Sequence, residues 1–285
     1  MVSLREIVPG WARLLLWRSI RRYGLATVRY RTLPDFIIIG AQKSGTSSLY
    51  SYLSQHPQLV PSFKKELHFF DGGLHPDVDN FEKGEAWYRA HFFQKRNTSD
   101  NRKAFEATPS YIFNPLAPQR ISELIPEVKL IAVLRNPRER AISHYFHETR
   151  RDREPLPIME AFQAEEERLR PLIAKQDYKN EIFIHKSYKS RGLYHKQIKR
   201  YLDYFPMSNI LVINSETLFQ QPDDTLRRVF QFIGVDAGFT VKNLKPSNMG
   251  TNKAKIDPDV YEYLEDYFRP HDEELYELIG QNFGW

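Results

Sequence analysis

Four short hydrophobic runs, each bounded by polar residues, stand out along the chain. Two of them, "DFIIIGA" (Asp35–Ala41) and "KLIAVLR" (Lys129–Arg135), are almost continuously apolar, as is typical of strands buried on both faces. "NILVINS" (Asn209–Ser215) has the same character, and "KAFEATPS" (Lys103–Ser110) is a weaker example. The pattern predicts at least four strands in one buried sheet.

Helical periodicity fills the intervals between these runs. In the first interval, Leu49, Tyr52 and Leu53 fall on one side of a helix, as an amphipathic segment requires. The predicted helices cover Thr46–Gln55, Asn136–Arg150, His195–Tyr204 and Thr225–Ile233. Strands that alternate with helices predict an α/β fold in three layers, with a central parallel sheet flanked by helices.

Residues 148–190 interrupt this alternation, because they are highly charged and contain prolines near the start and at Pro171. We interpret them as a helical insertion over the substrate cleft rather than as a separate domain. The acidic run Glu165–Glu167 is interpreted as a solvated helix face. We therefore expect a basic, helical leader over residues 1–32 and a single domain over residues 33–285.

Composition narrows the class of protein. A chain of 285 residues with 41% hydrophobic residues can bury an ordinary core and is not a disordered chain. It contains no cysteine, which excludes a disulfide scaffold, a thiolate metal site and a cysteine nucleophile. This composition agrees with a reducing compartment, so we expect a cytoplasmic protein, with membrane association as an alternative.

The positive charge is concentrated at the N-terminus. Residues 1–31 carry seven arginines and one acid, so the rest of the chain is close to neutral and nucleic-acid binding is disfavoured. The apolar run "WARLLLW" is too short to span a bilayer and lacks the pattern of a signal peptide. Such a helix could lie on an anionic membrane. We favour a helix that packs on the outside of the domain through Trp11, Leu15 and Trp17.

The run "FIIIGAQKSGTSSL" predicts an anion-binding loop. Gly40 and Gly45 have the spacing of a Walker A loop, but Thr46 stands where that loop has lysine, and Lys43 lies upstream. A strand, a glycine turn and a helix start present free backbone N–H groups to a phosphate. The residues expected to hold it are Lys43, Ser44, Gly45, Thr46, Ser47 and Ser48.

A second cationic position indicates two phosphate groups and no metal. A Walker-type nucleotidase holds Mg²⁺ partly through an acid at the end of a neighbouring strand, whereas this chain has Arg135 there. Ser143 follows on the next helix. His144 and His147 have helical spacing but lack a convincing third ligand, so no metal site is assigned. A nucleotide with a 5′ phosphate-linked group and a separate 3′ phosphate suits this arrangement.

These motifs give the chain a resemblance to the PAPS-dependent sulfotransferases, closest to the heparan-sulfate glucosaminyl type and its bacterial relatives. The similar stretches, spread from about Leu33 to Trp285, are "FIIIGAQKSGTSSL", "KKELHFFD", "FEATPSYIF", "LRNPRERAISHYF", "GLYHKQIKRYLDYFP" and "YFRPHDEELYELIGQNFGW". The resemblance implies a P-loop-like fold and PAPS as co-substrate.

The resemblance also implies roles for individual residues. The glycine loop would bind the 5′-phosphosulfate, Arg135 and Ser143 the 3′ phosphate, and Tyr194 would lie near the nucleotide. Lys43 would stabilise the leaving phosphate. Glu66 would be the base that accepts the acceptor's proton, with His68 supporting it.

The chain departs from the family pattern at two places. Ala107 stands where some relatives carry lysine, which leaves Glu106 either to meet the acceptor or to pair with an arginine. Near the C-terminus, Lys253-Ala254-Lys255 replaces a Lys-Gly-Arg that closes over the nucleotide. Lys253 and Lys255 keep the cations, and both are assigned to nucleotide binding.

The acceptor and two rival functions stay open at the level of sequence. A glycan or a small natural product could be sulfated at a hydroxyl or an amine. Phe69, Phe70, Tyr111, Phe113 and Tyr145 could stack on it or belong to the core. The rivals are a metal-dependent P-loop kinase for small molecules and a membrane-associated protein that binds a nucleotide or lipid phosphate.

Overall fold

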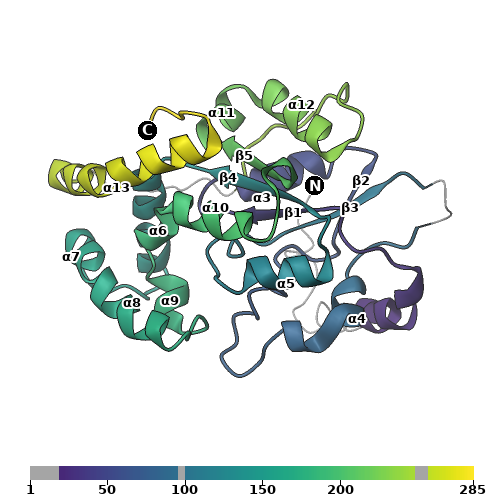
Figure 1. The fold of residues 1–285 in the computed structure, drawn as a ribbon, viewed down its shortest axis with the longest axis horizontal. Coiled ribbons are helices and arrows are strands. Elements are labelled where there is room, and N and C mark those ends of the chain that lie inside the picture. Colours follow the sequence, from purple (N-terminus) through teal and green to yellow (C-terminus); the bar gives the residue numbers. More distant parts are fainter. Residues whose placement is uncertain (1–18, 96–99, 248–255) are drawn as a thin grey trace.

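A central parallel sheet forms the middle layer of the molecule (Figure 1). The computed structural model describes residues 19–95, 100–247 and 256–285. Within them the sheet has five strands in the order β2-β3-β1-β4-β5. Their bounds are Phe36–Gly40 (β1), Leu59–Pro61 (β2), Lys103–Ala107 (β3), Lys129–Leu134 (β4) and Ile210–Asn214 (β5). All four pairings between neighbouring strands are parallel, as the sequence predicted.

The strands are continuously apolar because helices cover both faces of the sheet. Alternate residues of β1 enter two different cores: Ile37 and Ile39 belong to one and Phe36 and Ile38 to the other, and all four are fully buried. The first core is completed by α5 (Ala117–Leu124), α10 (Tyr194–Leu202) and α13 (Pro258–Ile279). The second is completed by α3 (Thr46–Leu53) and α12 (Pro222–Ile233). The three-layer prediction is confirmed.

The four predicted strands and the four predicted helices are all present, with ends shifted by up to three residues. The helix predicted over Asn136–Arg150 is α6 (Pro137–Thr149), which Asn136 caps by accepting hydrogen bonds from the amides of Arg138 and Glu139. The sequence reading missed β2, which has only three residues and lies at the edge of the sheet. It also missed four helices, which are α4 (Gly84–Arg89), α5, α11 (Ser215–Gln220) and α13.

Residues 148–190 contain the expected helices, and their role as an insertion over a substrate cleft stays a prediction. They contain α7 (Ile158–Gln163), α8 (Glu165–Ala174) and α9 (Glu181–His185), which are seen at the lower left of Figure 1, below α6. The interpretation of the acidic run as a solvated face is wrong for Glu165, which is 1% exposed. Its carboxylate accepts hydrogen bonds from the backbone amides of Lys189 and Ser190. The first acid of the run therefore binds a turn that lies far along the chain and does not face solvent.

The described end of the basic leader packs on the domain. Residues 19–26 are helical, and a Cβ on Gly24 would come within 2.5 Å of the carbonyl oxygen of Ala90, so the helix approaches the end of α4 closely. The guanidinium of Arg31 is buried and donates to the carbonyl of Phe92. Trp11, Leu15 and Trp17 lie outside the described residues. Among the described helices, none combines the length and the apolar character that crossing a bilayer requires.

Candidate functional site

The loop between β1 and α3 has the backbone geometry of an anion-binding loop. Gly45 stands at the N-cap of α3 with φ of 93°, and a Cβ there would come within 2.9 Å of the ring of Phe219. Glycine therefore meets both a conformational and a steric demand. Gly45 supplies no side-chain cap at the start of α3, and the N-terminus of a helix is a general binding place for anions.

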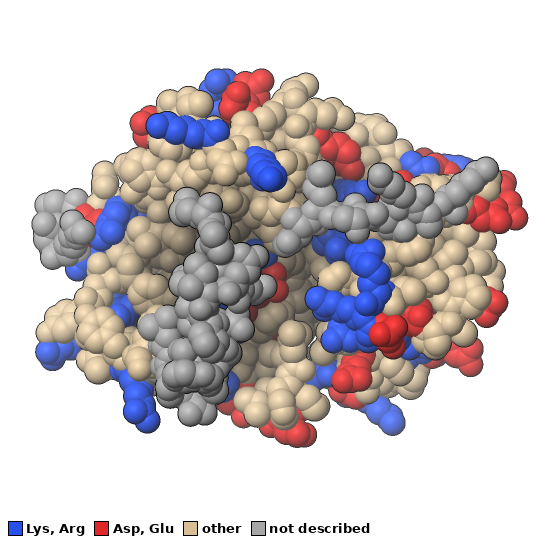
Figure 2. Space-filling view, turned by 180° about the vertical axis from the view of Figure 1, so that it is seen from behind, with Lys and Arg blue, Asp and Glu red and all other residues tan. Residues whose placement is uncertain are grey.

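Lys43 lies at the turn of this loop among other cations. Burial of the ammonium group lowers the pKa of Lys43, and the nearby charges of Arg150, Arg135 and Arg151 lower that pKa further. Glu148 opposes this shift. An excess of positive charge around a half-buried lysine favours an anionic ligand. Figure 2 shows lysine and arginine side chains gathered along one side of a hollow in the face opposite that of Figure 1.

Arg135 follows the last residue of β4 and reaches the loop from the neighbouring strand. Its Nη1 lies 3.5 Å from the carbonyl oxygen of Lys43, and its Nη2 lies 3.4 Å from Glu139. The hydroxyl of Tyr194 donates to the carbonyl of Arg135 at 2.9 Å, so α10 supports the backbone at this point. The structure thus brings the glycine loop and Arg135 together. Ser143 is half-buried two turns into α6.

The hydroxyl residues of the loop have different surroundings. Ser44 is fully buried next to Tyr194, and Thr46 is 5% exposed at the start of α3. The hydroxyl of Ser48 accepts a hydrogen bond from the amide of Ser247 at 2.9 Å. Ser48 therefore ties α3 to the segment that leads to residues 248–255. Lys253 and Lys255, assigned to the nucleotide from the sequence, lie outside the described residues.

Glu66 is connected to the loop by a lysine that the sequence analysis did not single out. The Nζ of Lys65 lies 2.7 Å from a carboxylate oxygen of Glu66 and 3.0 Å from the hydroxyl of Ser47. The backbone of Glu66 has φ of 62°, and its amide donates to the carbonyl of Ala107 on β3. The carboxylate is 45% exposed and is held next to the start of α3. In the sequence, only its position next to Glu66 indicated that Lys65 could belong to the site.

His68 belongs to a buried polar group with Asp71 and Ser110. Its Nδ1 lies 2.7 Å from the Asp71 carboxylate, which also accepts a hydrogen bond from Ser110. Burial alone would lower the pKa of His68, but the hydrogen bond and charge of Asp71 outweigh it and raise this pKa. Burial would raise the pKa of Asp71, but the hydrogen bond and the charge of His68 outweigh burial and lower this pKa. His68 is thus protonated more readily than an ordinary histidine, which suits a supporting role better than that of a second base.

Glu106 does not pair with an arginine among the described residues. It is fully buried on β3 and its carboxylate accepts hydrogen bonds from Tyr88, Thr108 and Tyr111. Burial raises the pKa of Glu106 to about 7.

The aromatic residues considered as possible stacking partners of the acceptor are core residues. Phe69, Phe70, Tyr111, Phe113 and Tyr145 are all less than 9% exposed.

His144 and His147 of α6 lie next to the buried Glu148. Nε2 of His144 and Nε2 of His147 lie 3.6 Å and 3.8 Å from the carboxylate of Glu148, and Nδ1 of His185 lies 3.4 Å from it. Burial would raise the pKa of Glu148, but its contacts with His144 and His185 outweigh burial and hold this pKa below its ordinary value. Glu148 also opposes the cations around Lys43, so the sequence missed a residue that shapes the charge of the site.

A glycine loop with anion-binding geometry after the first strand, an arginine at the end of the adjacent strand and a parallel sheet between two layers of helices are the features of a P-loop-like α/β fold. A model of the sulfotransferase domain family matches residues 33–269, and the chain belongs to this family. The protein is therefore a sulfotransferase with a P-loop-like α/β fold.

Individual relatives agree with this family. Mouse heparan sulfate glucosamine 3-O-sulfotransferase 3A1 is 32% identical, with 99% of this chain and 70% of that protein covered. Human bifunctional heparan sulfate N-deacetylase/N-sulfotransferase 2 is 28% identical, and the match covers 87% of this chain and 30% of that protein. A solved sulfotransferase from Alicyclobacillus acidocaldarius is 33% identical with a TM-score of 0.71, and covers 88% of this chain and 98% of its own.

Proposed function

We propose that this sulfotransferase moves the sulfuryl group of PAPS to a hydroxyl group of a glycan. The observation that best supports PAPS as the donor is the contact between Arg135 and the loop of Lys43, because it places two groups that can bind phosphate next to each other. The amides and hydroxyls at residues 43–48 hold the 5′-phosphosulfate. Arg135 and Ser143 hold the 3′ phosphate, and Lys253 and Lys255 complete the nucleotide site.

The transfer needs a base and a stabilised leaving group. The acceptor oxygen attacks sulfur as its proton passes to the carboxylate of Glu66, and the bond from sulfur to the bridging phosphate oxygen breaks. The electron pair of that bond stays on the phosphate, which leaves as adenosine 3′,5′-bisphosphate. Lys43 stabilises the charge that develops there. Lys65 keeps Glu66 beside Ser47, and therefore beside the loop that holds the donor.

His68 acts through its neighbours in this proposal. It sits two residues after Glu66, and the buried Asp71 and Ser110 fix the orientation of its ring. The positive φ values of Glu66 and His68, 62° and 51°, mark a tightly turned segment that aims both side chains. His68 is therefore a positioning residue for the base.

The choice of a glycan rests on the named relatives. Both act on heparan sulfate by name, one at a 3-O position of glucosamine and one as an N-sulfotransferase, at 32% and 28% identity. The higher identity to the O-sulfotransferase favours a hydroxyl over an amine. Mass spectrometry of an acceptor panel of oligosaccharides and small natural products, with labelled sulfate donor, tests this choice. Sulfation of the small molecules alone would contradict it.

The rival kinase activity has less support. A kinase of the P-loop type needs an acid near the end of the neighbouring strand for Mg²⁺, and Arg135 holds that place. Thermal shift with adenosine 3′,5′-bisphosphate against ATP plus Mg²⁺ separates the two activities. We expect a shift with the bisphosphate that does not need Mg²⁺. The same experiment on a leader-deleted chain tests whether residues 1–31 contribute to nucleotide binding.

A further inference from the structure

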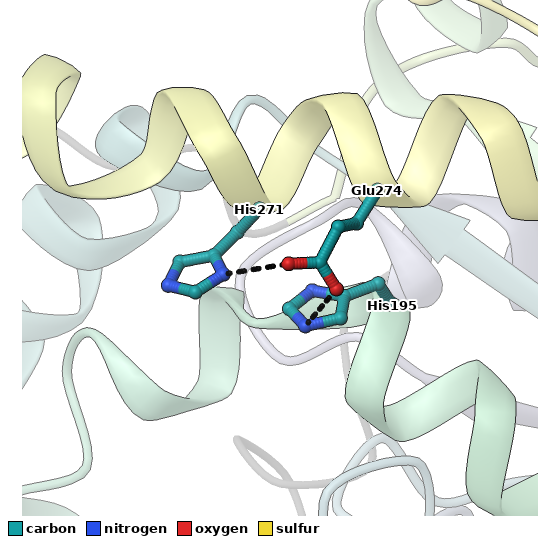
Figure 3. A group of neighbouring side chains, drawn as sticks. All are labelled: His195, His271 and Glu274. Atoms are coloured by element: carbon teal, nitrogen blue, oxygen red, sulfur yellow. Dashed lines mark ion pairs between the residues drawn. The ribbon is translucent and has the colours of Figure 1, made fainter.

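Two histidines and a glutamate meet where α10 crosses α13 (Figure 3). His195 comes from α10, whereas His271 and Glu274 lie three residues apart on one face of α13. Each offers one ligand atom, and these atoms lie within 4.8 Å of one another. In residues 19–95, 100–247 and 256–285 no other group of three such side chains is as close.

The distances approach those of a coordination shell. Nε2 of His195 lies 3.3 Å from Oε2 of Glu274, and Nδ1 of His271 lies 3.9 Å from Oε1. Two ligand atoms bound tetrahedrally to zinc at about 2.0–2.2 Å are separated by roughly 3.3 Å. The first pair already has this separation. The second pair involves the other carboxylate oxygen, so a rotation of the 59% exposed Glu274 side chain is needed to bring one oxygen, or both, into the same coordination shell as the two nitrogens.

The histidines have nitrogen atoms without hydrogen-bond partners. His195 is 5% exposed, and in the described parts of the chain neither of its ring nitrogens makes a hydrogen bond, nor does Nδ1 of His271; Nε2 of His195 and Nδ1 of His271 have only the contacts with Glu274 given above. Leaving a buried polar nitrogen unsatisfied costs free energy. The two rings are stacked with centroids 5.0 Å apart and an angle of 8° between their planes, which leaves their edges open toward Glu274.

Both imidazoles favour the neutral form that binds metals. Burial lowers the pKa of His195, and the charges of His271, Lys196 and Lys199 lower it further against the opposing effect of Glu274. The pKa of His271 is lowered by burial and by Lys196. Protons therefore compete weakly for these nitrogens at neutral pH.

We propose that His195, His271 and Glu274 bind a divalent transition-metal ion, with zinc as the best match. Two imidazoles and one carboxylate suit zinc and leave a fourth position for water. The ion would join α10 to α13. Tyr194, the neighbour of His195, supports the backbone of Arg135, so the ion would stiffen the helix behind the candidate nucleotide site. No step of sulfuryl transfer passes through it.

Metal titration of the full chain tests this site. After treatment with a chelator, the protein is titrated with Zn²⁺ by calorimetry and with Co²⁺ by visible absorption. We expect one equivalent of each metal to bind, with the absorption of tetrahedral Co²⁺. His271→Ala and Glu274→Gln should each weaken binding by roughly tenfold or more. His75→Ala, which changes an exposed histidine paired with Asp77, is the matched control and should bind as the unsubstituted protein does.

The two variants alter partly exposed side chains, so both should fold. Circular dichroism and thermal shift with adenosine 3′,5′-bisphosphate verify folding independently of the metal. Absence of saturable binding to the unsubstituted protein would overturn the site. Binding that is equal in His271→Ala, Glu274→Gln and the control would also overturn it, because the metal would then lie elsewhere.

Discussion

Nη1 of Arg135 lies 3.5 Å from the carbonyl oxygen of Lys43, although the two residues are 92 positions apart in the chain. The contact exists because β1 and β4 are parallel neighbours, so that their carboxyl ends open onto the same edge of the sheet. A ligand that touches the glycine loop can therefore also touch the guanidinium. This geometry supports a donor with two separate phosphate groups.

Replacing Arg135 with alanine should weaken the binding of adenosine 3′,5′-bisphosphate by roughly tenfold to a hundredfold. A hydrogen bond to a charged group contributes about 1.5–3 kcal/mol, and alanine removes it. Calorimetry measures the change. Arg227→Ala, which removes an exposed arginine paired with Asp224, is the control and should leave affinity unchanged. Equal affinity in the two variants would exclude Arg135 from the nucleotide site.

Glu66→Gln should reduce turnover by about 10² to 10⁴, the usual contribution of a positioned base, while the affinity for the bisphosphate stays within a few-fold. The amide keeps the shape of the side chain but cannot take the acceptor proton. Rates are measured with labelled PAPS at saturating acceptor. Glu127→Gln, at an exposed position, is the control. Turnover at the original rate would remove Glu66 from the role of base.

Gly45→Ala should cost more stability than the same change at Gly280. Both glycines have positive φ, 93° and 64°, so both substitutions strain the backbone. Only at Gly45 would the new methyl group meet the ring of Phe219, since nothing lies within 4 Å at Gly280. Thermal unfolding compares the two variants. Bisphosphate binding should be lost only in Gly45→Ala, and a loss in both would show that the loop geometry is not the cause.

The pair of His68 and Asp71 should make stability depend on pH. The pKa of His68 is raised above 6.5 in the folded protein, so its protonation stabilises the fold fully below that pH. This contribution is lost as the pH rises through the folded pKa. Asp71→Asn should flatten the dependence of the free energy of unfolding in this range. Asp77→Asn, beside the exposed His75, is the control and should leave the dependence unchanged.

Glu106 should have an effect of the same sign on stability, beginning at a lower pH. Burial raises its pKa to about 7 from an ordinary value of 4.5, so the folded protein resists ionisation of this carboxyl. Stability conferred by the protonated form declines as the pH rises from 4.5 through the folded pKa. Glu106→Gln should remove this decline in denaturant titrations. An unchanged slope would mean that Glu106 is ionised or solvated in the folded state.

The buried strands could be predicted from the sequence because their composition follows directly from their surroundings. β1 and β4 are covered on both faces, and their ends were found to within one residue. β2 could not be found, since three residues carry no periodicity and its pairing with β3 joins distant positions. The roles of Lys65 and Asp71 depend on Ser47 and Ser110, which are 18 and 39 positions away.

The sequence indicated which motif residues lie close together, but not the charges and hydrogen bonds that surround them. The loop and Arg135 follow from strand ends that any parallel sheet brings together. The buried Glu165 accepts hydrogen bonds from backbone amides 24 and 25 positions away, and Glu148 lies beside His185 of α9; both depend on tertiary contacts. Local spacing carries no record of such partners.

The most direct measurement is a calorimetric titration of the full chain with adenosine 3′,5′-bisphosphate, once with Mg²⁺ and once with chelator, compared with ATP under the same conditions. The account predicts tight binding of the bisphosphate that is equal with and without Mg²⁺, and weaker binding of ATP. Binding of ATP that requires Mg²⁺, together with weak or absent binding of the bisphosphate, would contradict it.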